Sequence, residues 1–413
     1  MQEFGSSTDL AARSHGIAEP DDVAEVRRLA RDFVHDVLEP AEAVLDRIAD
    51  PAEVFESPVF VKAMEAAFDL GMTRASMPRE WGGPGWSTFA QLVLAEELAA
   101  GAPGLGSHIL TAGISASLII STKAWKREPV YEAYLRDRSS IECATRGGAW
   151  AATEPTVGSD ILSLNTPNVS YRVVATPTDD GYSLSGEKSA LVGNAYCADM
   201  LVVMANIPDT SDMSGSVALL VPKDLPGVTV SRPTDKLGLR ALNQSTIRFD
   251  DVRVPKAALA FGPGDSVKRY VVNMTSRGNT AVGLQSIGVA QRAFEVALAH
   301  VREREQGGSK LFDHQLVAHS LFSAYREIHA ARAFSYRAVR LLEDRRLDPL
   351  VCYASRVQAS TMAVRVVEQL VQLMGGAGIV KDNPIERYYR DVKLLTIADG
   401  PVDKVALVAA QYL

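Results

Sequence analysis

Residues 386–400 read ERYYRDVKLLTIADG, a charged amphipathic stretch that ends in an Asp-Gly pair close to the C-terminus. Asp399 is either a general base or a helix N-cap, because PVDKVALVAAQYL follows it with helical spacing. The charged residues before it, Arg387, Arg390 and Asp391, are expected to form a salt-bridged surface or interface segment.

The segment just upstream, QLMGGAG (372–378), ends a helical pattern with paired glycines. Gly375 and Gly376 either allow close approach of the backbone to a ligand or form a helix C-cap and loop. The spacing is not GxGxxG and no strand pattern precedes it, which excludes a Rossmann dinucleotide motif.

Another candidate ligand contact lies in VREREQGGSKLFDHQ (301–315). Either Arg302 or Arg304 can hold a phosphate through its forked guanidinium. The alternative is a solvated helix end, where cations are favourable.

The segment AWAATEPTVGSD (149–160) lies where helical spacing gives way to strand spacing. Thr153, Ser159 and the backbone of Gly158 offer hydrogen-bond donors to a planar heterocycle. The alternative is an ordinary turn, because TEP and GSD are both turn-forming.

Apolar spacing divides the chain into a helical part, a β part and a second helical part. Asp22 and Glu25 have the spacing of a capping box at the first helix. Four long periodic stretches with short connections indicate an antiparallel bundle at the C-terminal end. The expected divisions are a frayed segment at 1–18, a helical domain at 19–147, a β-domain at 148–262 and a bundle at 263–413, whose helical stretches are 267–306, 312–344, 347–374 and 400–413.

Composition limits the classes of function. The chain has 413 residues and a net charge of -7, which argues against nucleic acid as a partner. Its three cysteines and His108, His314 and His319 show no metal-site spacing, so no metal is expected. We expect a cytoplasmic protein without a signal peptide or a membrane span.

Taken together, these segments resemble the acyl-CoA dehydrogenase family of flavoproteins. The matching stretches are PREWGGPGWS (78–87), ATEPTVGSD (152–160), KLGLRALNQSTIRFDDVRVP (236–255), QLMGGAG and ERYYRDVKLLTIADG, and the resemblance covers 20–413. It implies an α+β fold with an N-terminal α-helical domain, a central β-barrel or sandwich domain and a C-terminal four-helix bundle.

The resemblance also implies FAD, held between the β-domain and the bundle of a homodimer, often within a homotetramer. Gln372 and Gly376 would reach the FAD adenosine half from the neighbouring subunit, and Arg304 would contact the pyrophosphate. The full set of implied cofactor residues is Trp150, Ala152, Thr153, Ser159, Arg304, Gln372, Gly375 and Gly376. The implied substrate residues are Ser159, Ala398 and Gly400.

The family reaction removes an α-proton from an acyl thioester and passes the β-hydride to flavin N5, leaving an enoyl thioester. The thioester here is carried by CoA or by an acyl-carrier protein, and electrons would leave to an acceptor such as electron-transfer flavoprotein. Asp399 stands where the family usually has a Glu. Because Asp is shorter by one C–C bond, about 1.5 Å, either the backbone or the substrate sits differently or the reaction is not the usual one.

Several positions depart from the family pattern. Ala190 replaces an aromatic residue near the flavin, Gly307 replaces a Phe, and Pro401 replaces a hydroxyl residue that touches FAD. The alternative base of the family, a Glu in the first bundle helix, has no counterpart in 276–279.

These departures leave two other functions open. One is a non-redox or inactive homologue with an eroded FAD site. The other resembles the nitroalkane oxidases, which use Asp at this position but carry an Arg seven residues later, where this chain has Ala406.

Overall fold

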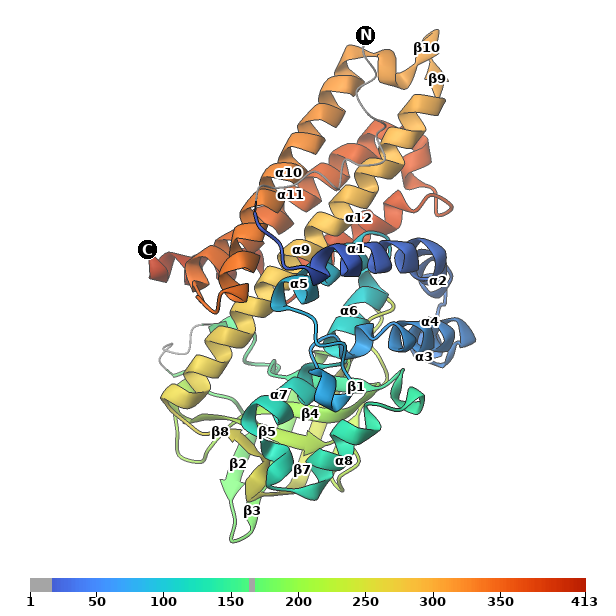
Figure 1. The fold of residues 1–413 in the computed structure, drawn as a ribbon. Helices are drawn as coiled ribbons and strands as arrows, with labels where there is room; N and C mark the ends of the chain where they lie inside the picture. The colour runs from blue at the N-terminus through green and yellow to red at the C-terminus, as the bar shows by residue number, and fades with distance from the viewer. Residues whose placement is uncertain (1–16, 163–167) are drawn as a thin grey trace.

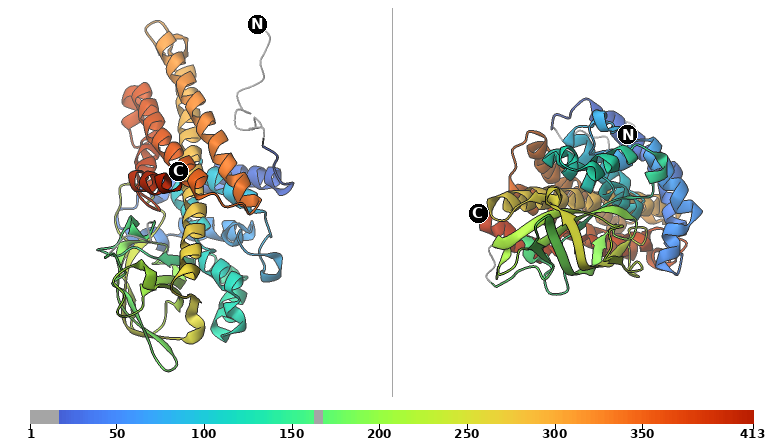
Figure 2. Two further views of the ribbon diagram at one scale, coloured as in Figure 1. Left: turned by 90° about the vertical axis from the view of Figure 1, so that its left-hand side faces the viewer. Right: turned by 90° about the horizontal axis from the view of Figure 1, so that it is seen from below.

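The computed structural model describes residues 17–162 and 168–413, so the segment expected to be frayed lies almost wholly outside it. Within the described chain the order is helices, sheet, helices, as the sequence predicts (Figure 1). Figure 2 shows the same arrangement from two further sides, with the sheet at one end of the long C-terminal helices.

The N-terminal helices pack around α5, which is buried along most of its length and packs against α9. Ser87 caps α5, since its Oγ accepts from Ala90 N at 3.0 Å. The capping box expected at Asp22 is wrong, because the Asp22 carboxylate instead accepts from Ser87 N and Ser87 Oγ across the fold. The helices are α1 (Asp22–Phe33), α2 (Glu39–Leu45), α3 (Pro51–Glu56), α4 (Pro58–Asp69), α5 (Thr88–Ala99), α6 (Pro103–Thr111), α7 (Ile114–Thr122) and α8 (Pro129–Asp137).

One described stretch, Pro103–Thr122, is long and apolar enough to cross a membrane, with a hydropathy of 1.4. It is not one helix, because residues 112 and 113 form a turn between α6 and α7. In the apolar window, 67% of the residues are buried inside the protein, including His108 and Ser115. These features are those of core helices.

The middle of the chain forms one mixed sheet with the order β6-β7-β3-β2-β4-β5-β8, and β1 pairs in parallel with β4. β4 and β5 alternate little and are almost wholly buried, which makes them the centre of this core. The strands are β1 (Gly147–Ala151), β2 (Val174–Pro177), β3 (Gly181–Gly193), β4 (Ala198–Asn206), β5 (Ser216–Pro222), β6 (Val228–Val230), β7 (Gln244–Pro255) and β8 (Leu259–Phe261).

In the C-terminal part, α9 runs from the sheet to the far end of the molecule, where a small hairpin follows it (Figure 1). α11 runs beside α9 in the same direction, since Gly283 meets Arg356 and Ser286 bonds Ser360 one turn further along. The elements are α9 (Asp265–Glu303), β9 (Glu305–Gln306), β10 (Ser309–Lys310), α10 (Gln315–Glu343), α11 (Pro349–Met374), α12 (Ile385–Leu395) and α13 (Val402–Ala409).

Two details of this part differ from the sequence-based expectation. The charged segment of residues 385–395 is the helix α12, which packs on both α9 and α11. Its salt bridges are present, but Arg387 and Asp391 are 4% and 1% exposed, so they do not lie on a surface. The alternation of charged and apolar residues produces an amphipathic helix whose arginines are covered by α2 and the loop before β7.

Candidate active site

The turn between α12 and α13 presents Asp399. α12 ends at Leu395, and Asp399 and Gly400 have φ values of 53° and 108°. Aspartate is one of the few residues other than glycine that tolerates this left-handed conformation. The N-cap of α13 is Pro401 and no side chain caps the helix, so the helix-cap alternative for Asp399 is wrong.

The Asp399 carboxylate lies against α9 at Gly278, one of three glycines in that helix. A Cβ built on Gly278 would stand 2.7 Å from Asp399 Oδ2. The neighbouring Asn279 donates from Nδ2 to Asp399 O at 3.3 Å. The glycine and the left-handed turn together accommodate the shorter carboxylate of aspartate.

Asp399 lies in a recess. Its side chain is open to solvent in the single chain, yet protein atoms surround it closely, and this burial raises the pKa of the carboxyl. The positive charge of Arg356 opposes that shift. No side chain or backbone group in 17–162 or 168–413 donates a hydrogen bond to the carboxylate, which leaves it available to an outside proton.

The backbone N–H of Asp399 also has no acceptor among the described residues, although the N–H groups of Ala398 and Gly400 on either side do. A free N–H beside a carboxylate in a recess is suited to bind an oxygen on which negative charge develops. The same residue thus offers a proton acceptor and a hydrogen-bond donor.

Gly278→Ala is expected to act in opposite directions on stability and turnover. Alanine stabilises a helix interior relative to glycine by about 0.5–1 kcal/mol, so α9 gains stability. The new methyl group displaces the Asp399 carboxylate, and a misplacement of about 1 Å costs on the order of 100-fold in rate. Urea unfolding and steady-state kinetics on the same preparations measure both effects. A stabilised variant with unchanged turnover would contradict this placement of the carboxylate.

The loop after β1 comes close to this turn. Leu162, the last residue of the short helix η7 (Ser159–Leu162), would stand 2.6 Å from a Cβ on Gly400. At the start of the loop, Thr153 O accepts from Ser189 N at 2.9 Å, which ties the loop to β3. The structure therefore brings η7 and the Asp399 turn together.

The chemistry of this region fits a flat, partly apolar cofactor. Leu191 on β3 is 52% exposed although it is apolar. The Ser189 hydroxyl is buried without a partner among the described residues, and a Cβ on Gly158 would meet nothing within 4 Å. An exposed apolar side chain, an unused hydroxyl and an open glycine are features of a site completed by a planar ligand.

The remaining expected cofactor residues lie at the other end of the bundle. Arg304 follows α9 directly, and Gly375 and Gly376 follow α11, which runs in the same direction. The 26 residues of α9 from Gly278 to Arg304 span about 39 Å at 1.5 Å per residue. One chain therefore cannot bring Arg304 and Asp399 to the same small ligand.

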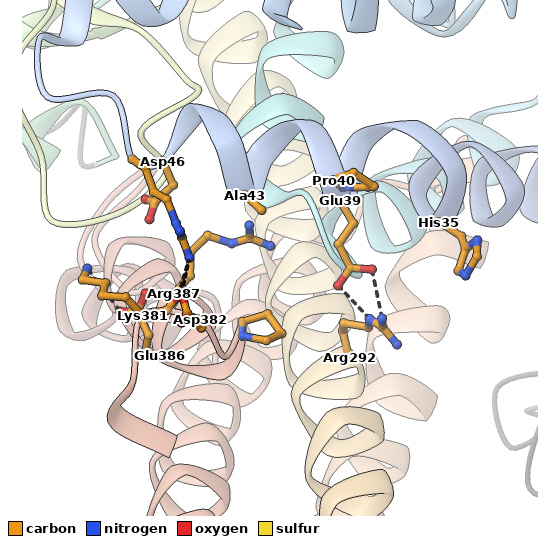
Figure 3. A pocket seen from close by; sticks show the side chains of 12 residues that line it. His35, Glu39, Pro40, Ala43, Asp46, Arg292, Lys381, Asp382, Glu386 and Arg387 are labelled. Atoms are coloured by element: carbon orange, nitrogen blue, oxygen red, sulfur yellow. Dashed lines mark hydrogen bonds and ion pairs between the residues drawn. The ribbon is translucent and has the colours of Figure 1, made fainter. Parts of the chain in front are cut away.

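A separate cleft of about 320 Å³ opens between α2 and α12 (Figure 3). Its charged side chains are largely paired with one another, as in Glu39 with Arg292 and Arg47 with Asp382. None of the residues lining it comes from the Asp399 turn or from the loop after β1. The candidate active site at Asp399 is therefore separate from this cleft.

The described chain thus has three parts, which are an N-terminal helical part, a middle sheet and a C-terminal helical part that presents a carboxylate. Residues 20–127 match the N-terminal domain, 149–252 the middle domain and 269–411 the C-terminal domain of acyl-CoA dehydrogenase. The chain belongs to the acyl-CoA dehydrogenase family, whose members typically bind FAD.

Relatives match over most of the chain. A probable acyl-CoA dehydrogenase of Bacillus subtilis, YngJ, is 29% identical over 94% of this chain and 97% of its own. The mitochondrial short/branched chain specific acyl-CoA dehydrogenase of Bos taurus is 30% identical over 82% of this chain and 74% of its own.

Solved structures show the same fold. Butyryl-CoA dehydrogenase from Megasphaera elsdenii has a TM-score of 0.80 at 26% identity, covering 96% of this chain and 98% of its own. An active-site mutant of nitroalkane oxidase, crystallised with 1-nitrooctane, has a TM-score of 0.84 at 22% identity and covers 96% of each chain. The latter likeness concerns the fold alone.

Proposed function

We propose that this protein is an FAD-dependent dehydrogenase of acyl thioesters in which Asp399 removes the α-proton. The supporting observation is the Asp399 carboxylate, held in a recess with no internal hydrogen-bond partner and beside a backbone N–H that is also free. Thioester α-protons are acidic only when the carbonyl oxygen is stabilised, and the two groups of Asp399 meet both needs.

The residues that would hold the cofactor ring are Trp150, Ala152, Thr153 and Ser159, at the end of β1 and in the loop that follows it. When bound, FAD supplies an acceptor for the β-hydride. The chain holds the substrate carbonyl, takes the α-proton onto a carboxylate oxygen and shields the reacting carbons from water. The products are an enoyl thioester and two electrons for an external acceptor.

The far group of expected contacts, Arg304, Gln372, Gly375 and Gly376, belongs in this proposal to a second copy of the chain. The spacing along α9 supports this assignment, because these residues lie too far from Asp399 in their own chain. Gly375 and Gly376 have open space around their Cβ positions, which leaves room for a ligand against the backbone.

The decisive experiment offers the purified protein a panel of acyl thioesters, each on CoA and on a carrier protein, with an electron-accepting dye. We expect dye reduction and, by mass spectrometry, a product lighter by two hydrogens. The absorbance spectrum between 350 and 500 nm tests FAD independently. Protein that takes up no FAD would favour the cofactor-free homologue instead.

A second candidate function is the oxidation of nitroalkanes, which also begins with removal of an acidic C–H proton by a carboxylate. The aspartate at position 399, in place of glutamate, favours it, whereas Ala406 does not. Formation of hydrogen peroxide from 1-nitrooctane, with no dehydrogenation of any thioester, would replace the first proposal with this one.

A further inference from the structure

Arg356 in α11 is a buried cation that forms no ion pair at hydrogen-bond distance with any described carboxylate. It is 0% exposed, and burial lowers its pKa to about 10. An isolated buried charge is costly, so a protein keeps one only where its surroundings compensate for it.

The guanidinium donates to the backbone that leads into Asp399. Nη2 donates to Leu395 O and, at 3.0 Å, to Ala398 O, while Nη1 donates to Ser360 Oγ. Leu395 is the last residue of α12, where helix carbonyls lack partners and carry partial negative charge. Arg356 therefore fixes the end of α12 and the residue immediately before Asp399.

Arg356 is also the charge that acts most directly on the Asp399 carboxylate. The facing residues of α9, Gly278 and Asn279, are uncharged. The short helix η7 contributes Leu162 and also carries Asp160, whose carboxylate accepts from Gly158 N at 3.1 Å. The first turn of α13 carries Asp403, which is exposed, and Lys404, which is half-buried.

We propose that Arg356 is a positioning residue that holds the Asp399 turn in its left-handed conformation and favours the ionised form of its carboxyl group. The proposal rests on the proposed role of Asp399 as the base. The direction of the pKa shift follows from the charges. Burial favours the neutral carboxyl group, whereas a nearby cation favours the carboxylate. Removing the cation is therefore expected to raise the pKa of Asp399.

The kinetic test compares Arg356→Met, Arg356→Gln and Arg356→Lys over a pH series, with butyryl-CoA and the responding thioester of the panel as probes. In the Met and Gln variants we expect turnover at pH 7 to fall by about 10- to 100-fold and the acidic limb of the kcat profile to move to higher pH. Arg356→Lys retains the charge, so we expect the acidic limb of its kcat profile to lie at the wild-type pH. The control Arg365→Met, at an exposed arginine of the same helix, is expected to leave the profile unchanged.

A second measurement needs neither substrate nor cofactor turnover. In a double-mutant cycle of urea unfolding at pH 7, Asp399→Asn should lower the unfolding midpoint of the wild type, where it deprives Arg356 of its counter-charge. In the Arg356→Met or Arg356→Gln background the same change should raise the midpoint, because it removes an uncompensated carboxylate.

The proposal would be overturned if the effects of the two substitutions on the unfolding midpoint were additive. It would also be overturned if the acidic limb of the kcat profile kept its pH in the neutral Arg356 variants. The cycle also separates this inference from the proposed function. If the protein is inactive on every thioester but the unfolding midpoints of the cycle are not additive, the Arg356–Asp399 interaction stands and only the proposed reaction is wrong. Should neither neutral variant fold, Arg356→Lys tests the positioning role alone, because it keeps the charge but loses the forked contacts to Leu395 O and Ala398 O. Turnover at pH 7 equal to that of the wild type would then overturn that role.

Discussion

Replacing Asp399 by asparagine is expected to lower turnover by about 10²- to 10⁴-fold, the contribution usually made by a positioned general base. The amide has the same size and keeps the backbone N–H of residue 399, so substrate binding should persist while proton removal fails. Since the carboxylate accepts no hydrogen bond from a described residue, the fold around it and the bound FAD should also persist. Stopped-flow measurement of flavin bleaching by the thioester separates loss of chemistry from loss of binding.

Asp403→Asn is the matched control for this experiment. It removes one negative charge four residues further along, from an exposed side chain in the first turn of α13, and is expected to leave turnover unchanged. An Asp399→Asn variant as active as this control would show that another group removes the proton.

Much of the fold is predictable from local sequence patterns. The change from a period of 3.6 to a period of two near residue 148 locates the sheet, because amphipathic helices and alternating strands have different repeats. The bundle is predictable for the same reason, except for its fourth helix. There the apolar stretch at 400–413 suggested a long helix, and the structure has the short α13 and the separate α12.

The burial of α12 was not predictable, because the segment is rich in charged residues. A segment as polar as IERYYRD is usually solvated, and its burial depends on partners that are distant in sequence. Arg390 pairs with Asp46, and Asp391 accepts from Leu239 N. The expected capping box at Asp22 is wrong for the same reason, because the Asp22 carboxylate accepts from Ser87 N, which is distant in sequence. Tertiary contacts of this kind leave no periodic signal.

In the candidate site, Asp399 could be singled out from the sequence, but the residues that contact its turn could not. Gly278 and Arg356 come from two other helices, and their relation to Asp399 exists only in three dimensions. Each does leave a weak trace: a glycine inside a long helix, and an arginine among the mostly small side chains of VCYASRVQAS. A glycine inside a helix and a charged residue on a buried helix face are both local inconsistencies that point to a tertiary role.

The second large effect is expected at the buried pair beneath the loop after β1. Lys188 Nζ donates to Glu154 Oε1 at 2.7 Å and to Ala152 O at 3.1 Å, and both charged side chains are 0% exposed. Glu154 also accepts from the N–H groups of Arg172 and Val173. The pair thereby joins β3, the strand that carries Ser189 and Leu191, to the loop that carries Thr153 and Ser159.

Lys188→Met leaves the Glu154 carboxylate buried without its cation, and breaking a buried pair in this way costs about 3–5 kcal/mol. Urea unfolding followed by far-UV circular dichroism measures the loss. Neutralising the partner as well, in Lys188→Met with Glu154→Gln, is expected to recover part of it, because no unpaired charge then remains.

Arg248→Met provides the contrast on the same sheet. Its partner Glu187 is adjacent to Lys188 in β3, but the two side chains are 70% and 36% exposed, and the pair lies in water. Exposed pairs contribute about 0–1 kcal/mol, so this variant should unfold almost as the wild type does. If Lys188→Met were equally mild, the loop would not depend on the ion pair. If it is severe, loss of FAD from the folded fraction should accompany it, since the loop that would hold the cofactor ring is anchored through Ala152 and Glu154.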